Sequence, residues 1–249
     1  MSTEATPARH WRFYIPRASD CCPRWTTCGR APPPPDTCRY SRPPGSPRPP
    51  PWRTGLGVRA WCDMSSVGGG WTVVAGRRAH QPEVNFSRPL LHYQFGFGDP
   101  ENQHWLGLDH MHALTRATNS TLRVVLHHYA LPAPLHATYQ AFSVGSREDG
   151  HRLTVEGYDP SSTAADALSP HSGAPFTCPD PRYSGNSCVE EVEAGWWFLE
   201  APLCYLALPT GLAAPPEPGR GVRGTLAWLG LQYSPETFLL MIRREGESG

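Results

Sequence analysis

The sequence of 249 residues contains no lysine, and its 22 arginines balance 22 acidic residues. It also lacks an uninterrupted apolar run of about 18 residues, the length that a transmembrane helix needs. The longest candidate, residues 201–214, is short and contains Pro202 and Pro209, so we expect no membrane-spanning segment. We attribute the missing lysine to codon bias, because selection for anion contacts would cluster arginine on one element.

Motifs of the common enzyme classes are missing as well. There is no Gly-x-Ser-x-Gly elbow, no phosphate-binding loop and no Cys/His pair at a catalytic spacing. Eleven histidines include His110-x-His112 and the adjacent His127 and His128, near Asp109. Adjacent residues of a strand point to opposite faces, so His127 and His128 cannot share one metal ion. We therefore predict that the protein is not an enzyme.

Charge and proline are unevenly distributed along the chain. Residues 1–60 hold ten arginines against three acidic residues, and 13 of the 29 prolines. Such composition favours extended, unpacked chain, so we expect a disordered Pro/Arg-rich head over residues 1–55 and a folded domain over residues 56–244. The alternative explanation of the arginines is that the Pro/Arg-rich head binds glycosaminoglycan, nucleic acid or membrane lipid. For the protein as a whole we predict no nucleic-acid partner.

The eight cysteines indicate disulfides rather than zinc. They allow about 105 complete pairings, but no two Cys-x2-Cys pairs of the kind that bind zinc. Two glycosylation sequons, at Asn85 and Asn119, agree with an oxidising compartment. The first 30 residues lack the apolar core of a secretory signal, so the prediction of a secreted, extracellular protein depends on the body of the chain.

Alternation of apolar and polar residues predicts an antiparallel sheet in the body. The strands expected from this alternation are residues 122–127, 137–145 and 152–156, and apolar runs predict two further strands at residues 71–74 and 237–243. Residues 159–188 are rich in Ser, Pro, Gly and Asp without periodicity, which predicts a long irregular region.

Two short helices are expected before the central strands. The first would be capped by Ser87, run through Tyr93, end at Gly96 and pack through Leu90, Leu91 and Phe95. The second would start at Asp109, with Met111 and Leu114 on one side.

Several strings then follow one another in a familiar order. They are Cys62-Asp63-Met64, Gly68-Gly69-Gly70-Trp71, Trp105-Leu106-Gly107-Leu108, Arg152-Leu153-Thr154-Val155, Gly195-Trp196-Trp197 and Trp228-x-Gly230. With them, the chain from Cys38 to Arg244 resembles the fibrinogen C-terminal-like domain, the module of fibrinogen chains, ficolins, techylectins, angiopoietins and tenascins.

The resemblance implies an α+β fold. Its parts would be a small N-terminal sheet, a central antiparallel sheet with flanking helices, and a loop-rich C-terminal subdomain that binds ligands and calcium. It also implies two disulfides, Cys188–Cys204 and Cys62 with Cys38, for which Cys28 is the alternative partner. Cys178 has no family partner, which leaves a free thiol, an interchain link or a codon accident.

The calcium loop departs from the family pattern. Asp180 matches the first carboxylate, but Arg182 stands at the second position and Ser184 at the next acidic one. Calcium takes six to eight oxygen ligands, and backbone carbonyls near Ser184 and Asn186 would have to supply them. We therefore expect Asp180 to be an ordinary loop carboxylate, with calcium binding as the alternative.

The neighbouring ligand pocket departs from the pattern too. After Cys204, Tyr205 replaces the family's histidine, and the following polar string is lost. Tyr205, Trp196 and Trp197 are candidates for an aromatic ligand pocket, with burial in the core as the competing interpretation for the tryptophans.

Together these features predict a secreted, non-enzymatic recognition protein that engages a receptor or another extracellular partner through its C-terminal loops. The alternative is an innate-immune lectin for acetylated or sialylated glycans. No heptad run is present, and a homo-oligomer is left open.

Overall fold

The structure is a computed structural model that describes residues 60–63, 66–78, 83–183, 185–212, 224–231 and 235–244. The predicted head over residues 1–55 lies outside these residues, as do Cys28 and Cys38. No helix in the described part of the chain has the length and apolar character to cross a bilayer.

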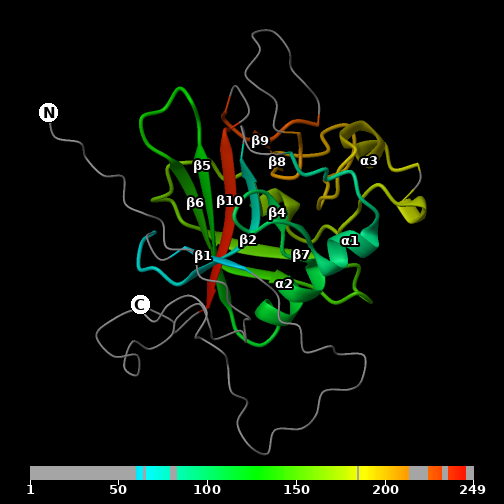
Figure 1. The fold of residues 1–249 in the computed structure, drawn as a ribbon, viewed down its shortest axis with the longest axis horizontal. Helices are drawn as coiled ribbons and strands as arrows, with labels where there is room; N and C mark the ends of the chain where they lie inside the picture. The colour runs from blue at the N-terminus through cyan, green and yellow to red at the C-terminus, as the bar shows by residue number, and fades with distance from the viewer. Residues whose placement is uncertain are drawn as a thin grey trace, which may run out of the picture.

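The elements follow one another from β1 to β10 along the chain (Figure 1). The strands are β1 Trp61–Asp63, β2 Trp71–Arg78, β3 Phe97–Gly98, β4 His104–Trp105, β5 Ser120–His127, β6 Leu135–Val144, β7 Leu153–Tyr158, β8 Ala207–Leu208, β9 Ala227–Trp228 and β10 Thr237–Arg244. The helices are α1 Leu90–Phe95, α2 Leu108–Thr115 and α3 Ser187–Val192, with 3-10 turns η1 Ser169–His171 and η2 Pro181–Tyr183.

An eight-stranded sheet organises the described residues. Its strand order is β3-β4-β2-β10-β5-β6-β7, with β1 paired to β2, and the pairs are antiparallel. The final strand, β10, lies in the middle and pairs with both β2 and β5 (Figure 1). The expected small N-terminal sheet is therefore not separate, because β2 carries β1 and β4 into the same sheet as the central strands.

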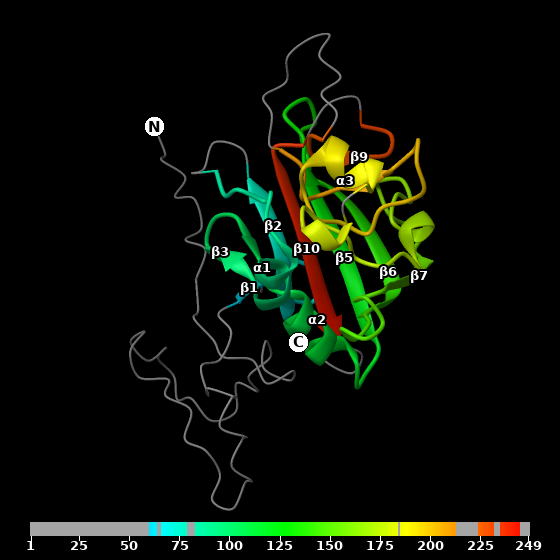
Figure 2. The ribbon, with the colours of Figure 1, turned by 90° about the vertical axis from the view of Figure 1, so that its right-hand side faces the viewer.

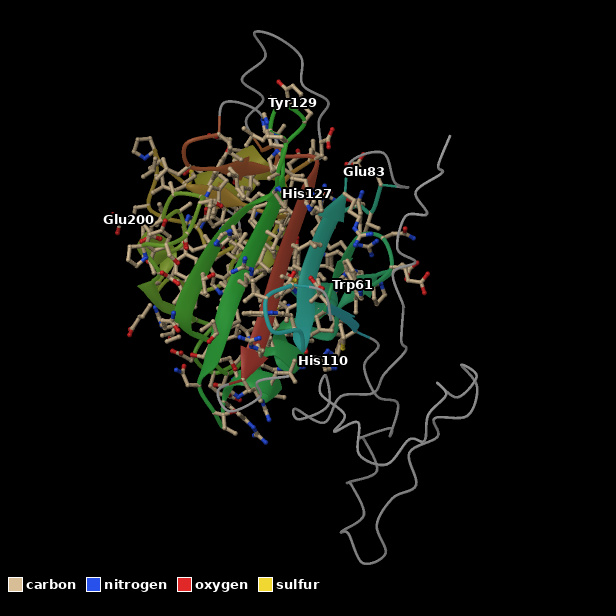
Figure 3. All side chains as sticks on the ribbon, turned by 90° about the vertical axis from the view of Figure 1, so that its left-hand side faces the viewer. Trp61, Glu83, His110, His127, Tyr129 and Glu200 are labelled. Atoms are coloured by element: carbon tan, nitrogen blue, oxygen red, sulfur yellow. A yellow bond between two sulfur atoms is a disulfide. The ribbon has the colours of Figure 1, made fainter. Side chains whose placement is uncertain are left out.

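The strands predicted from alternation are confirmed, and the two sheet faces differ. Leu122, Val124 and Leu126 on β5 are fully buried under α1, α2 and the C-terminal loops, which cover this face (Figure 2). The opposite face carries a smaller apolar cluster that includes Trp71, Met241 and Trp61, which is labelled in Figure 3. The α+β architecture therefore has its main core on the helix side of the sheet.

The first helix was predicted correctly in existence but wrongly in its packing face. α1 buries Leu90, Tyr93 and Gln94, whereas Leu91 is 55% and Phe95 57% exposed. Residues spaced by three and four share one face of a helix, so burying Leu90 together with Tyr93 turns Leu91 and Phe95 to solvent. Ser87 makes no cap bond; the helix ends at Gly96 as expected.

The other expectations for local structure are confirmed. α2 buries Met111, and Leu114 packs against the core. Between β7 and α3 the described residues form two 3-10 turns and a single bridge between Thr177 and Trp196. This irregular stretch leads into the C-terminal loops.

Candidate functional site

The C-terminal loops are tied to α3 by the Cys188–Cys204 disulfide that the resemblance implied. Its two Cα atoms are 5.4 Å apart, and both cysteines are buried. Asn186 caps α3 by accepting hydrogen bonds from the N–H groups of Cys188 and Val189. A loop of this length makes the disulfide worth about 3 kcal/mol in the chain-entropy model.

The upstream disulfide is described at one end. Cys62 is disulfide-bonded, while the expected partners Cys38 and Cys28 lie outside the described residues, so the choice between them stays a prediction. Cys178 is free and fully buried, and burial raises the pKa of its thiol to about 12. Of the three interpretations of Cys178, the free thiol agrees with this placement, because an interchain link needs an accessible sulfur.

The structure places the two tryptophan candidates in the core rather than in an open pocket. Trp196 is 0% and Trp197 1% exposed. Trp197 donates from Nε1 to the His151 carbonyl and packs edge-on against Phe176. Both indoles therefore lie in the core, as the competing interpretation expected. A ligand cannot reach them unless the domain opens.

The third candidate, Tyr205, is half-buried beside the disulfide. Its hydroxyl accepts a hydrogen bond from the Gly224 N–H at 3.1 Å. This contact joins the residues after Cys204 to the segment that leads into β9. Tyr205 thus positions the two loop segments relative to each other while being only partly buried.

His171, which the sequence did not predict as a site residue, holds the segment after Cys204 from the buried side. Its Nδ1 donates to the Trp197 carbonyl at 2.7 Å, and its Nε2 accepts from the N–H groups of Leu206 and Ala207 at 3.1 and 3.3 Å. These partners require the neutral tautomer with the proton on Nδ1, and burial lowers the pKa of His171. No local motif marks this role, since all three partners are backbone atoms.

Arg77 was also missed, because its partners are two backbone carbonyls and a side chain 26 residues away, which no local motif marks. It is 2% exposed and donates to the carbonyls of Val84 and Gly211 and to Oε1 of Gln103. Burial lowers the pKa of its guanidinium to about 10. Arg77 thereby fixes the loop after β8 to β2.

Three leucines are exposed on the loops that these contacts hold in place. Leu203 is 56%, Leu212 57% and Leu229 43% exposed. They flank the β8–β9 pair, and Leu212 also bridges to Thr225. We call Leu203, Tyr205, Leu212 and Leu229 the C-terminal loop surface. The β9 strand, which Leu229 follows, lies near α3 in Figure 2.

The residues at the family's calcium position do not fit calcium. Arg182 donates from Nε to Oδ1 of Asp180 at 2.9 Å, and its hydrogen bonds lower the pKa of that carboxyl. Within the described residues no three His, Cys, Asp or Glu side chains form a group that could hold a metal ion; Ser184 lies outside them. A guanidinium on the one matching carboxylate repels a cation.

A pocket of about 390 Å³ lies next to Asp180. It is lined by Ser87, Pro179, Asp180, Tyr183, Val189, Glu190 and Glu193. Glu190 also accepts a hydrogen bond from the Gly185 N–H. The pocket is therefore acidic, although the Asp180 charge is already paired.

His110 and His112, which were considered as metal ligands, form hydrogen bonds with backbone carbonyls. The Nδ1 of His110 contacts the Leu106 carbonyl at 2.9 Å, and the Nδ1 of His112 contacts the Val144 carbonyl at 2.8 Å. A carbonyl only accepts, so both imidazoles donate. His127 ends β5 and His128 follows it in the turn toward Tyr129, labelled in Figure 3.

Both sequon asparagines are exposed. Asn85 accepts a hydrogen bond from the Ser87 N–H in the loop before α1, and Asn119 directly precedes β5. Side chains in such positions are accessible to a glycosyltransferase.

Comparison with known proteins agrees with this architecture. Residues 52–244 match the family model of the C-terminal globular domain of the fibrinogen beta and gamma chains. Human fibrinogen C domain-containing protein 1 is 36% identical over 194 residues, covering 75% of this chain and 41% of that protein. Human tenascin-N is 34% identical over 193 residues, covering 77% of this chain and 14% of that protein.

Solved structures give the same result. The fibrinogen-like globe domain of human ANGPTL6 matches with a TM-score of 0.66 and 30% identity, covering 75% of this chain and 83% of that one. For the corresponding ANGPTL2 domain the TM-score is 0.68 and the identity 27%, with 77% and 88% covered. The chain spans about two fifths of fibrinogen C domain-containing protein 1. It belongs to the fibrinogen C-terminal domain family.

Proposed function

We propose that this chain is a secreted, non-enzymatic recognition protein whose C-terminal loop surface binds a receptor or another extracellular protein. The observation that carries the proposal is the exposure of Leu203, Leu212 and Leu229 on loops that are held from several sides. Exposed apolar side chains on loops that a rigid scaffold holds in place are typical of protein-binding surfaces. A pre-ordered surface also loses little conformational entropy on binding.

An oxidising compartment agrees with the covalent chemistry of the chain. The Cys188–Cys204 disulfide and the disulfide-bonded Cys62 require such an environment to persist. The exposed sequons at Asn85 and Asn119 add sites for glycosylation in the secretory pathway. We propose an extracellular location on these grounds.

A lectin for acetylated or sialylated glycans is the alternative. Aromatic side chains usually supply the stacking surface of sugar sites, but Trp196 and Trp197 are buried and the Tyr205 hydroxyl is bonded to Gly224. The placement of these side chains therefore favours a protein partner over a glycan.

The test is binding of the purified chain to cell surfaces, measured by flow cytometry with competition by unlabelled protein. We expect the triple variant Leu203→Ser, Leu212→Ser, Leu229→Ser to lose affinity by about tenfold or more. The matched control is Leu91→Ser with Phe95→Ser, which removes equally exposed apolar side chains from α1. The control should bind like the unmodified protein.

Two results would overturn the proposal. One is equal binding by the triple variant and the unmodified protein. The other is specific binding to acetylated or sialylated glycans on an array that Tyr205→Ala abolishes, which would establish the lectin instead. Thermal unfolding of each variant separates lost binding from lost folding.

A further inference from the structure

The carboxylate of Asp180 is saturated by hydrogen bonds from its own chain. Oδ1 accepts from the Arg182 N–H at 3.1 Å and from Arg182 Nε at 2.9 Å. Oδ2 accepts from the Leu90 N–H at 3.1 Å and from Arg182 Nη2 at 3.3 Å. Four donors around one carboxylate leave little capacity for another ligand.

Burial makes a partner for this carboxylate necessary. The Asp180 side chain is 7% exposed, whereas the Arg182 side chain is 63% exposed. A carboxylate largely removed from water is destabilising unless a positive charge and hydrogen bonds compensate it. The planar guanidinium meets both needs with two parallel N–H groups, while its outer edge stays hydrated.

Asp180 in turn supplies the N-terminal cap that α1 lacks. The N-cap residue of α1 is Pro89, and no side chain of the helix's own turn caps it. Leu90, the first helical residue, instead donates its N–H to Asp180 from a segment 90 residues later in the sequence. The ion pair therefore connects the irregular segment before α3 to α1.

The rest of this segment is also closed by protein groups. The Tyr183 N–H donates to the Asp180 carbonyl at 2.8 Å within η2, and the Asn186 N–H donates to the Tyr183 carbonyl at 3.1 Å. Asn186 then caps α3. A series of hydrogen bonds thus connects Asp180 through Tyr183 and Asn186 to the start of α3.

We propose that Arg182 takes the place of a bound cation in this domain: it neutralises Asp180, holds the segment 177–183 against α1, and makes the stability of the domain independent of calcium. The proposal concerns folding and goes beyond the proposed function, so binding assays do not bear on it.

The first test compares thermal unfolding of the full chain in excess calcium chloride and in EDTA, with calorimetric titration of calcium. We expect the same midpoint in both solutions and no heat of binding. A midpoint more than about 2 °C higher in calcium, or stoichiometric calcium uptake, would overturn the proposal.

The second test isolates the side chain. Arg182→Ala should lower the midpoint by roughly 4 °C, whereas Arg116→Ala, which removes an exposed arginine after α2, should leave it unchanged. In the Asp180→Asn background the Arg182→Ala change should add less than about 1 °C, because the charge that it serves is gone.

Two outcomes of this series would contradict the role of Arg182. One is an effect of Arg182→Ala no larger than that of Arg116→Ala. The other is an undiminished effect in the Asp180→Asn background, which would show that Arg182 acts through other groups. The readout is unfolding alone, so failure here leaves the proposed function untouched.

Discussion

Among the described residues, the sheet region, which comprises residues 60–158 and β10, and the loop region, residues 159–231, are stabilised in different ways. In the sheet region β10 and β5 share a continuous register of eight residue pairs, and the buried faces of the strands form a continuous core. In the described part of the loop region no strand is longer than two residues, and single contacts such as the Cys188–Cys204 disulfide and the His171 hydrogen bonds fix the backbone.

The difference explains where recognition is expected. A region that depends on a few point contacts can expose leucines and vary its loops, while the distributed sheet keeps the domain folded. The difference also predicts that a destabilising mutation in the sheet promotes unfolding of the whole domain, whereas one in the loops promotes only local unfolding.

The largest expected effect is a cavity in the sheet core. Leu122 on β5 is fully buried, so Leu122→Ala should lower the free energy of unfolding by about 4 kcal/mol. Denaturant unfolding measures the loss, and hydrogen exchange should show faster opening of all central strands together. Faster exchange confined to β5 would contradict a shared sheet core.

Removing the loop disulfide comes next. Cys188→Ser with Cys204→Ser should cost about 3 kcal/mol, with faster hydrogen exchange between residues 188 and 212 and little change in β5 and β6. Cys178→Ala is the control, because Cys178 forms no disulfide. Equal loss of protection in the strands would show that the loop region is not a local unit.

Acid should destabilise both regions through buried histidines. Burial lowers the pKa of His104 to about 4, and its Nδ1 has no acceptor among the described residues. The folded state therefore binds fewer protons than the unfolded state, whose histidines titrate near pH 6.5. The contribution of neutral His104 to the free energy of unfolding is fully present above that pH and is lost as the pH drops toward 4. At pH 5 the loss is roughly 2 kcal/mol for His104 alone.

Urea unfolding between pH 7.5 and 4.5 measures this loss. His171, whose pKa is also lowered by burial, adds to it in the loop region, since a proton on Nε2 removes the acceptor for Leu206 and Ala207. Stability that does not change between pH 7 and pH 5 would contradict the neutral, buried state of these imidazoles.

The smallest expected effect is the loss of one hydroxyl. Tyr205→Phe removes the acceptor for the Gly224 N–H and should cost about 1 kcal/mol. Because the ring stays in place, binding to a protein partner should weaken only slightly. A loss of binding as large as that of the triple leucine variant would instead place the hydroxyl in direct contact with the ligand.

Local alternation predicted β5, β6 and β7, whereas β2 and β10 are buried almost throughout and were predicted from their apolar runs. The spacing of Leu122, Val124 and Leu126 was enough to predict both β5 and its buried face. The packing face of α1 could not be predicted in this way, because Leu90, Leu91 and Phe95 are all apolar and tertiary contacts decided which of them are buried.

The irregular course of residues 159–188 was predicted from composition, but the specific features of the loop region were predictable only through the family resemblance. That resemblance gave the Cys188–Cys204 disulfide and the substitution of Arg182 for a carboxylate. It did not give the contacts of His171, Arg77 or Asp180 with the backbone, because such partners are distant in sequence and carry no side-chain signal. For a related reason the sequence left open whether Trp196 and Trp197 lie in the core or line a ligand site, because an aromatic pair looks the same in both; the structure places both indoles in the core.

The most direct test of a recognition surface on the loop region is photocrosslinking on living cells. A p-benzoylphenylalanine introduced at Leu212 reports contacts of the C-terminal loop surface, and the same group at Leu91 reports contacts of α1 at matched exposure. We predict a covalent adduct with a cell-surface protein from position 212 and none from position 91. An adduct from position 91 alone would contradict a recognition surface on the loops.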